Sequence, residues 1–531
     1  MFEAGADIAA GIGNRAAARP PRLLAALWVL LFLFAYSSLR LAMLGLEDSK
    51  TRRGAAGASE WTARADITDR SGELLASSVA GFKIKIYPGK MPPTWESAEI
   101  LMEIDPSLDS DAINGVMLSS KGGVYLGGCR PLPDYADMLA AARKFRRDWN
   151  EIEECRIRRY AKGRAVSHIT GFVDAYGDGA AGVEKFLDKK LKGGEPAVLS
   201  LDFRAQAIMR RELEQAKAAH GAKLAAGILM DSLNGEIIAA VQLPDFDPES
   251  AGSAWDDSKT FWPAQGTYEM GSIFKIFNTA LALESGLSRT KKYDVSKPFG
   301  TIRDKGASKN RPDAMTIDEI MLHSSNIGSA KIALSLPSGA QAEFFKKIGL
   351  HSPLEIDGMG KTRANAARKN PQDIEIATMA YGHGIAVSMM NLIAAVNAVA
   401  NGGIWVAPRL TKIPDGAEVS GRRVVSIETS KRVREIMFRV SEETTGRLAR
   451  ISGINIGSKT GTAEKRDGKG YSAYRNFNTF VAVFPIESPR YIMLVALDEP
   501  DAVPGVSRTA AHNVVPMTGR ILEQTVSLLL K

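Results

Sequence analysis

The stretch that decides the fold reads "AAGILMDSLNGEIIAAVQLP" and runs from Ala225 to Pro244. Its two apolar runs flank Asn234-Gly235, and such a pair between apolar runs is the strongest short-range signal for a β-hairpin. Near the C-terminus, "NTFVAVFPI" (478–486) and "RYIMLVALDE" (490–499) predict a second pair of strands. Because helical sequence lies between the two pairs, we expect an antiparallel sheet packed by helices, an α/β (α+β) fold of about 300 residues.

A helix and a smaller domain precede this sheet. "LDFRAQAIMRRELEQAKAAHG" (201–221) has the pattern of a helix that ends at its final glycine. Between Trp61 and about Pro196, strand-like pieces such as "GFKIKIYPG" (81–89) alternate with a helix-like stretch at 135–149, which indicates an α+β domain. We therefore expect two folded domains, 47–195 and 196–531.

The N-terminal part contains a membrane-spanning pattern. "LLAALWVLLFLFAYSSL" (23–39) is almost wholly apolar, and a further apolar piece (41–46) follows Arg40. About 20 apolar residues cross a bilayer as a helix, and the preceding Arg15, Arg19 and Arg22 favour a cytoplasmic N-terminus. A cleaved signal peptide is the alternative, but its apolar core is shorter and we find no convincing cleavage site. The sequence predicts a cytoplasmic tail (1–22), a single transmembrane anchor (23–46) and the remaining chain outside the cytoplasm.

Composition limits the classes of ligand. The net charge of +8 over 531 residues is mild, and the basic residues are scattered among acids, so no nucleic-acid partner is expected. The six histidines include no metal-spaced cluster, so neither a metal nor a cofactor is expected. "GMGKT" (358–362) lacks the glycine that a phosphate-binding loop needs five positions before Gly360, because Glu355 stands there.

The chain has two cysteines, Cys129 and Cys155. In an oxidising compartment they could form a disulfide that closes a short loop. Because a sequence gives no geometry, we prefer two unpaired thiols and keep the disulfide as the alternative.

A candidate nucleophile lies in "YEMGSIFKIFNTALALESG" (268–286), which predicts a mostly buried helix. Ser272 falls in its first turn, and Lys275 is on the same face three residues later. A buried lysine near a second cation loses affinity for its proton, and a neutral lysine can deprotonate a serine hydroxyl. The free N–H groups at the helix N-terminus, including that of Ser272, suit a developing oxyanion.

This spacing alone is a weak signal. A second copy, Ser288 and Lys291, falls in a charged loop, where we expect a solvated surface lysine. Taken alone, Ser272 and Lys275 would be a helix cap and a solvated lysine, so other motifs must support the catalytic interpretation.

Two further motifs supply that support. In Ser324-Ser325-Asn326, the hydroxyl of Ser324 could relay a proton between Lys275 and a leaving group, and the Asn326 amide can both donate to and accept from a peptide. In Lys459-Thr460-Gly461-Thr462, the lysine adds the second cation. The two threonine hydroxyls, Thr460 and Thr462, can bind a carboxylate, and Gly461 lets a peptide backbone approach.

The three motifs in this order resemble those of penicillin-binding proteins and serine β-lactamases. The whole chain is similar to class B penicillin-binding proteins of the cell-division peptidoglycan transpeptidase (FtsI) family. "RADITDRSGELLAS" (64–77), "HITGFVDAYGDGAAGVEKFLD" (168–188), "QLPDFDPES" (242–250) and "MAYGHGIAVSMMNLIAAVNAVANGG" (379–403) carry the similarity. It covers nearly everything except residues 1–20 and about 90–155.

The resemblance implies an elongated pedestal at 47–195, a transpeptidase domain at 196–531 and a role for each motif residue. Ser272 would be acylated, with Lys275 as general base, Ser324 as proton relay and Asn326 orienting the substrate. The Lys459–Thr462 strand would bind the terminal carboxylate of a D-Ala-D-Ala stem peptide, and the backbone N–H groups of Ser272 and Thr462 would form the oxyanion hole. β-Lactams would acylate the same serine.

The resemblance also implies partners and a location. The substrates would be stem peptides on lipid-linked glycan strands. The partners would be a membrane glycosyltransferase of the FtsW type and other division proteins. The protein would be a single-pass inner-membrane protein with a periplasmic catalytic domain.

Some positions depart from the family pattern. Met270 and Ala161 stand where proline is usual, Ile273 where threonine is common, and His323 where lysine is commoner. "GYSAYRNFNTF" (470–480) is also unusual and leaves the substrate contacts there open.

Three rival functions share parts of this pattern. A β-lactamase or β-lactam-sensing receptor would use the same serine chemistry but usually lacks the pedestal and the retained anchor. An elongation-type class B transpeptidase commonly has aspartate where Asn326 stands. A division scaffold without activity would not need Ser272, Lys275 and Lys459 together.

Overall fold

The computed structural model describes residues 64–92, 94–118, 122–132, 135–145, 148–251, 256–304, 311–365, 370–468, 470–502 and 507–530. The predicted tail and membrane anchor (1–46) lie outside these residues. Within the described ranges, no helix has both the length and the apolarity needed to cross a membrane.

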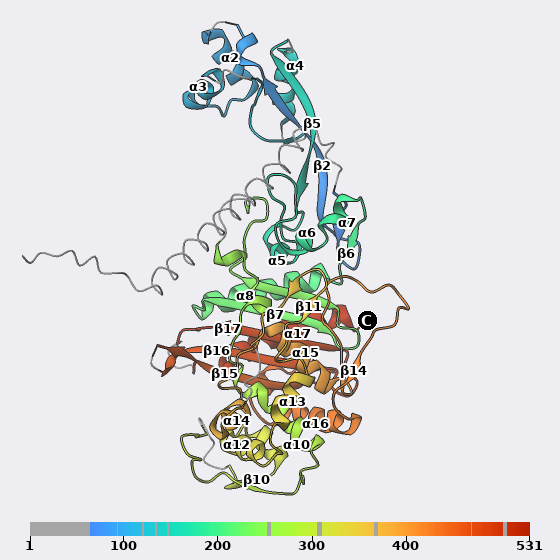
Figure 1. The fold of residues 1–531 in the computed structure, drawn as a ribbon, viewed down its shortest axis with the longest axis vertical. Coiled ribbons are helices and arrows are strands. Elements are labelled where there is room, and N and C mark those ends of the chain that lie inside the picture. Colours follow the sequence, from blue (N-terminus) through green and yellow to red (C-terminus); the bar gives the residue numbers. More distant parts are fainter. Residues whose placement is uncertain are drawn as a thin grey trace, which may run out of the picture. The chain divides into compact units, whose positions relative to one another are not determined.

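A five-stranded antiparallel sheet forms the centre of the C-terminal segment, residues 199–530, in the order β15-β16-β17-β7-β8 (Figure 1). The strands are β7 (Leu224–Asp231), β8 (Ile237–Leu243), β15 (Gly457–Asp467), β16 (Gly470–Phe484) and β17 (Tyr491–Asp498). Both predicted strand pairs are confirmed. β17 pairs with β7, which joins the two hairpins into one sheet, and β15 is an edge strand.

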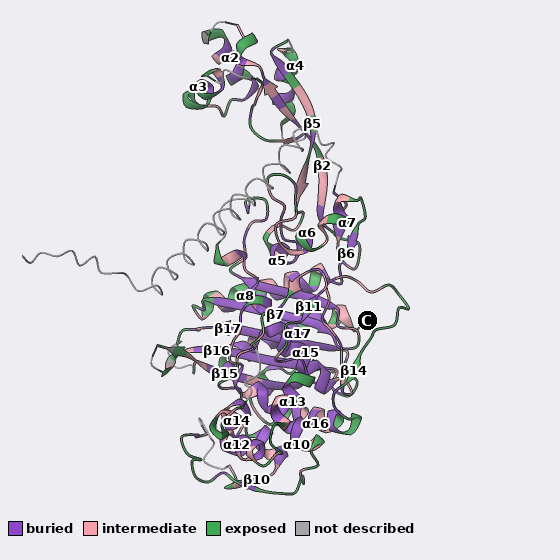
Figure 2. Ribbon diagram, viewed as in Figure 1, coloured by how far each residue is buried: buried purple, intermediate pink, exposed green. Residues whose placement is uncertain are grey.

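Alternate residues of each strand enter two different hydrophobic cores. One face packs against α8 (Phe203–Ala219) and α17 (Val514–Leu529), and α8 confirms the helix predicted at 201–221. The other face packs against α10 (Phe274–Glu284), α15 (Met389–Ala400) and α16 (Ile427–Glu443). The sheet is accordingly buried except toward the tip of the β15–β16 hairpin (Figure 2).

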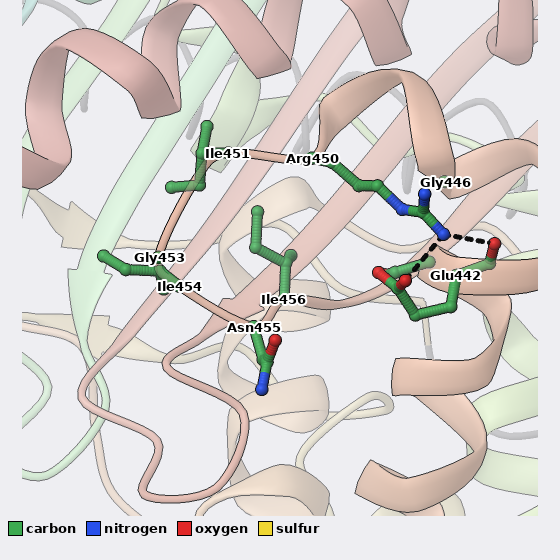
Figure 3. Close-up of a pocket in the computed structure, with 9 residues that line it drawn as sticks. Glu442, Gly446, Arg450, Ile451, Gly453, Ile454, Asn455 and Ile456 are labelled. Atoms are coloured by element: carbon green, nitrogen blue, oxygen red, sulfur yellow. Dashed lines mark hydrogen bonds and ion pairs between the residues drawn. The ribbon is translucent and has the colours of Figure 1, made fainter.

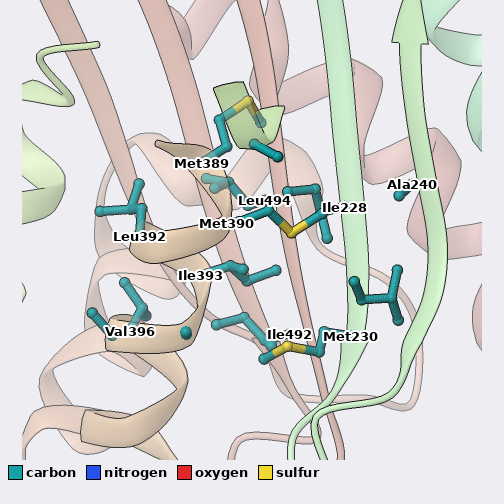
Figure 4. Packing of buried hydrophobic residues seen from close by; sticks show 14 of the residues in the cluster. Ile228, Met230, Ala240, Met389, Met390, Leu392, Ile393, Val396, Ile492 and Leu494 are labelled. Atoms are coloured by element: carbon teal, nitrogen blue, oxygen red, sulfur yellow. The ribbon is translucent and has the colours of Figure 1, made fainter. Parts of the chain in front are cut away.

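The helix α15 lies against the middle of the sheet. Its side chains, among them Met390 and Ile393, point toward Ile228, Met230 and Leu494 of the strands (Figure 4). All five of these residues are fully buried. This packing fixes the sheet as a rigid support for the helices that cover it.

Shorter elements complete the C-terminal segment. The helices are α9 (Trp262–Gln265), α11 (Ile317–Leu322), α12 (Asn326–Leu334), α13 (Ala340–Lys347) and α14 (Asp373–Met379). The two-residue strands are β9 (Tyr293–Asp294), β10 (Ala314–Met315), β11 (Glu355–Ile356), β12 (Gly360–Lys361), β13 (Ile404–Trp405) and β14 (Arg422–Arg423). The "GMGKT" stretch lies at the β11–β12 hairpin, without the strand-loop-helix context of a phosphate-binding loop.

The N-terminal segment, residues 64–198, has its own sheet around a long strand. β2 (Leu74–Ile86) pairs with β5 (Asn150–Arg159) along ten residues and contains most of the predicted strand at 81–89. The predicted helix at 135–149 is shorter, because α4 ends at Lys144 and the buried Trp149 leads directly into β5. The remaining elements are β1 (Ile67–Thr68), β3 (Val124–Tyr125), β4 (Arg130–Pro131), β6 (Ala197–Val198), α2 (Thr94–Ile104), α3 (Ser110–Leu118), α4 (Ala136–Lys144), α5 (Ser167–Thr170), α6 (Gly182–Phe186) and α7 (Asp188–Lys192).

A buried ionic network joins the family-like stretches of the N-terminal segment. Arg64 and Arg158 both bind the fully buried Glu184, at 2.8 and 2.6 Å. A carboxylate removed from water needs such partners, so the two arginines hold α6 in place. The Asp69 carboxylate accepts a hydrogen bond of 3.0 Å from the Phe203 N–H at the start of α8, which connects this segment to the C-terminal segment.

The preference for unpaired cysteines is wrong, because Cys129 and Cys155 form a disulfide. β2 pairs with both β4 and β5, so that Gly81 lies opposite Pro131 on one side and Cys155 on the other. This pairing brings the two Cα atoms to 6.0 Å, within bonding range. The pairing is a long-range contact that the local sequence pattern does not encode.

We expect this disulfide to stabilise the N-terminal segment. Replacing both cysteines by serine should lower its free energy of unfolding by about 3 kcal/mol, since the bond closes a loop with a sequence separation of 26. Urea unfolding followed by tryptophan fluorescence measures the change, and Ser288→Ala at an exposed site is the control. An unchanged unfolding midpoint in the double variant would contradict the expectation.

Candidate active site

The predicted nucleophile lies in a tight turn before a buried helix. The 3-10 turn Gly271–Ile273 holds Ser272 and leads directly into α10. Met270 and Ile273, two of the departures from the family pattern, flank the Gly271–Ser272 turn and are fully buried. Lys275 lies one helical turn on, and its Nζ donates a hydrogen bond of 2.7 Å to the Ser272 Oγ.

The second motif lies between α11 and α12. The Lys275 Nζ also donates to the Asn326 Oδ1 at 2.7 Å, so this lysine links the first two motifs. Ser324 has a positive φ of 57°, a strained backbone conformation for a residue with a side chain, and such strain often marks functional sites. His323 is exposed at the end of α11.

Asp304 was missed by the sequence analysis, yet it holds the second motif in place. Its carboxylate accepts hydrogen bonds from the N–H groups of Asn326 and Ile327, at 2.5 and 3.0 Å, and from the Ser325 hydroxyl at 2.8 Å. It also pairs with Arg311. A carboxylate at a helix N-terminus is stabilised by the free N–H groups there. An isolated aspartate about 20 residues before the motif carries no recognisable signal.

The third motif is on β15, the edge strand beside the nucleophile turn. The Lys459 Nζ donates a hydrogen bond of 3.1 Å to the Ser324 Oγ. Among the described residues, Ser324 is therefore bonded to Lys459, and no hydrogen bond joins it to Lys275. The Thr460 hydroxyl lies 3.4 Å from the hydroxyl of Thr445, a residue that the sequence analysis missed. The Thr462 hydroxyl accepts a bond of 3.2 Å from the Ala510 N–H.

Three glycines allow the close packing of these segments. A Cβ on Gly461 would collide with the Met270 carbonyl and the Thr479 hydroxyl. Gly271 has a φ of 54°, and a Cβ there would lie 2.7 Å from the Thr462 carbonyl oxygen. Its N–H donates to the Gly382 carbonyl at 3.3 Å, so the stretch around Gly382 supports the nucleophile turn from the other side.

Burial shapes the protonation of both lysines. Lys275 is 1% exposed and Lys459 is 2% exposed. Burial, and next the positive charge of Lys459, hold the pKa of Lys275 well below its ordinary value, although Asp304 opposes the shift. Burial lowers the pKa of Lys459 to about 8. The lowered pKa favours the neutral form of Lys275, which can accept a proton from Ser272, while Lys459 still carries charge at neutral pH.

Two other features lie apart from this site. Ser288 and Lys291, the second serine–lysine pair, are exposed as expected. A cavity of about 240 Å³ lies between α16 and the start of β15, and the Arg450–Glu442 ion pair crosses it (Figure 3). Ser441, which lines the cavity, donates a hydrogen bond to the buried Ser458, and Ser458 is the strand residue next to Lys459. The cavity is thus beside β15 and not at Ser272.

Comparisons with known proteins agree with this geometry. Residues 225–523 match the model of the penicillin-binding protein transpeptidase domain. The chain is 32% identical to the probable peptidoglycan D,D-transpeptidase FtsI of Caulobacter vibrioides, over 97% of this chain and 90% of the relative. The chain belongs to the class B penicillin-binding proteins of the FtsI family.

More distant relatives and solved structures are also similar to this chain. The peptidoglycan D,D-transpeptidase FtsI of Escherichia coli K12 is 27% identical, over 83% of this chain and 80% of the relative. Penicillin-binding protein 2X of Streptococcus thermophilus superposes with a TM-score of 0.71 at 18% identity, covering 88% of this chain and 80% of that one. A peptidoglycan synthetase of Bifidobacterium adolescentis gives a TM-score of 0.67 at 19% identity, with 88% and 95% covered. These structures share the fold of this penicillin-binding protein.

We expect Gly461→Ala to slow the acylation of this penicillin-binding protein by at least about tenfold, because a methyl group there pushes β15 away from the nucleophile turn. The second-order rate constant of acylation by a labelled penicillin measures the effect. Gly470→Ala on the same hairpin is the matched control, since its Cβ would meet nothing within 4 Å. Equal rates in the two variants would show that the close approach is unimportant.

The acylation rate should have a bell-shaped pH dependence. It should rise as Lys275 loses its proton, at a pH far below the ordinary lysine value of 10.5. It should fall as Lys459 loses its proton near pH 8. Lys459→Met removes the like charge, so the pKa of Lys275 should increase and the rising limb should move to higher pH. A rate that keeps rising into the range of an ordinary lysine would contradict this assignment.

Proposed function

We propose that the described site carries out peptidoglycan D,D-transpeptidation through an acyl-enzyme on Ser272. The observation that carries this proposal is the 2.7 Å hydrogen bond between the Lys275 Nζ and the Ser272 Oγ, at a lysine that is 1% exposed and lies near Lys459. Relatives named peptidoglycan D,D-transpeptidase FtsI support the reaction and its division type. As a member of the penicillin-binding protein family, the enzyme is a target of β-lactams.

The first half-reaction uses the two buried lysines. Neutral Lys275 takes the proton of Ser272 as the Oγ attacks the carbonyl carbon of the penultimate D-Ala of the donor stem peptide. The N–H groups of Ser272 and Thr462 bind the oxyanion of the tetrahedral intermediate. As the C–N bond breaks, the proton that Lys275 took from Ser272 passes through Ser324 to the departing amine of the terminal D-Ala. The donor remains as an ester on Ser272.

The donor peptide binds along the edge strand β15. An edge strand has one row of unpaired backbone groups, so an extended peptide can add to it as a further strand. The terminal carboxylate of the donor then lies at Lys459, Thr460 and Thr462, and the nearby Thr445 hydroxyl adds a fourth group. Asn326, which Lys275 holds at 2.7 Å, orients the donor amide.

The anchor, domains and partners predicted from the sequence form the second part of the proposal. Residues 1–22 are a cytoplasmic tail and 23–46 a single inner-membrane anchor, followed by the pedestal (47–195) and the periplasmic transpeptidase domain (196–531). The disulfide supports an oxidising compartment. The anchor and the pedestal bind a glycosyltransferase of the FtsW type and other division proteins, by analogy with the family.

The rivals differ in measurable ways. A β-lactamase would release the penicilloyl group rapidly, whereas a transpeptidase keeps it. A scaffold would support normal septation when Ser272→Ala is the only copy. The elongation-type alternative predicts a defect in cell length growth, and the division type predicts filaments.

Labelling with a fluorescent penicillin tests the proposed nucleophile. We expect one labelled peptide that contains Ser272, and no label in Ser272→Ala, because the Ser272 hydroxyl is hydrogen-bonded to Lys275, the lysine whose pKa is held well below its ordinary value. Ser288→Ala, at the exposed serine–lysine pair, is the matched control and should keep full labelling. Label on another residue, or label that survives in Ser272→Ala, would overturn the assignment.

A further inference from the structure

The carboxylate of Glu269 lies three residues before the nucleophile and is not used in the steps above. Its Oε1 accepts hydrogen bonds of 3.0 Å from the Gly384 N–H and 3.0 Å from the Tyr471 hydroxyl. Its Oε2 is buried and has no hydrogen-bond partner among the described residues. No ion pair joins Glu269 to any cation in the described part of the chain. Burial raises its pKa, although its two hydrogen bonds and the positive charge of Arg466 oppose the shift. Glu269 as a whole is half-buried, but a buried carboxylate oxygen without a hydrogen-bond partner is costly, so the position of Oε2 needs a reason.

Glu269 and Ser272 flank the same turn. The Gly382 carbonyl accepts from the Gly271 N–H, next to Ser272, while the Gly384 N–H donates to Glu269. Between these contacts, the Tyr381 ring lies 5.6 Å from the Lys275 Nζ. Burial, and next the Glu269 carboxylate, raise the pKa of Tyr381 to about 12.

An aromatic row continues from this turn to the β15–β16 hairpin. The rings of Tyr381 and His383 are 5.2 Å apart, and those of His383 and Tyr471 are 5.5 Å apart. Tyr471 belongs to the stretch at 470–480 that departs from the family pattern, and it is 42% exposed at the far end of the hairpin. The unusual stretch therefore covers Glu269 with a side chain that is itself open to solvent.

A second carboxylate near the nucleophile, that of Asp304, already has hydrogen-bond partners on both of its oxygens. It accepts from Asn326, Ile327 and Ser325 and pairs with Arg311. Its role is to hold the N-terminus of α12. Glu269, in contrast, has one oxygen without a partner, which can accept a hydrogen bond from a ligand.

The second half-reaction supplies a ligand of this kind. The acceptor is the amine of another stem peptide, which is an ammonium ion at neutral pH and cannot attack an ester in that form. It must be bound near Ser272 and lose a proton first. We propose that Glu269 binds the ammonium group of the acceptor stem peptide and takes its first proton. This inference rests on the proposed transpeptidase function.

The acceptor R–NH₃⁺ gives one proton to the Glu269 carboxylate, which becomes a neutral acid. The nitrogen lone pair then forms a C–N bond to the ester carbon, and the bond from that carbon to the Ser272 Oγ breaks. The second proton of the nitrogen passes to the Ser272 Oγ, and Glu269 returns its proton to solvent. The Tyr471 side chain turns away to admit the amine.

The test separates the two half-reactions. A thioester analogue of the donor acylates the enzyme, and the acceptor is either a tripeptide with a free side-chain amine or hydroxylamine, which is already neutral at neutral pH. Glu269→Gln should reduce transfer to the tripeptide amine by at least about tenfold, because a neutral amide neither attracts the ammonium nor takes its proton. Transfer to hydroxylamine and acylation by penicillin should change by no more than about twofold.

Two further variants distinguish binding of the amine from support of the hairpin. Tyr471→Phe removes the hydroxyl contact and keeps the carboxylate, so its transfer rate should fall far less than that of Glu269→Gln. Glu435→Gln, on the exposed face of α16, is the matched control. Equal losses with both acceptors, or an equal loss in Tyr471→Phe, would overturn the inference while leaving the proposed function intact. Failure of penicillin to acylate the wild-type Ser272 would overturn the proposed function and this inference with it.

Discussion

The structure depends on the burial of two lysines side by side. Lys275 and Lys459 are both almost fully buried, although removing an ammonium ion from water costs on the order of a few kcal/mol even after relaxation. Two effects offset this cost. Each Nζ donates to hydroxyl or amide oxygens, and the lowered pKa of Lys275 shifts its equilibrium toward the neutral form. The chemistry follows from this constraint, because the same desolvation that is costly for the folded state makes Lys275 a base.

The packing of the sheet and its helices excludes water from these two lysines. The sheet carries Lys459 on its edge strand, and α15 packs against the face of the sheet that α10 also covers. The nucleophile turn therefore has a rigid support on the sheet side. On the other side, Asp304 fixes the start of α12 and hence the position of Asn326. Three segments that are distant in sequence are thus held at hydrogen-bond distance by side-chain contacts and close packing.

The central sheet could be predicted from the sequence because its signals are local. Asn234-Gly235 between apolar runs, and the alternation of strand residues between two cores, need no knowledge of distant contacts. The three motifs were likewise recognisable by their short spacings. The disulfide, the Asp304 cap and the contact between Glu269 and Tyr471 were not predicted. The partners in these three contacts are separated by 26, 22 and 202 positions, respectively, and nothing in the residues around either partner indicates the other.

The interleaved glycines limit how this enzyme can evolve. At Gly461, Gly271 and Gly382 the neighbouring backbone occupies the space of a side chain, so even one methyl group displaces catalytic atoms. Changes that weaken inhibitor binding therefore cannot accumulate at the innermost contacts. The exposed residues around the site, such as Thr445 and Tyr471, have room for other side chains without this backbone clash. The geometry thus separates tightly packed backbone next to Ser272 from exposed side chains around it, and substitutions are sterically easier at the exposed positions.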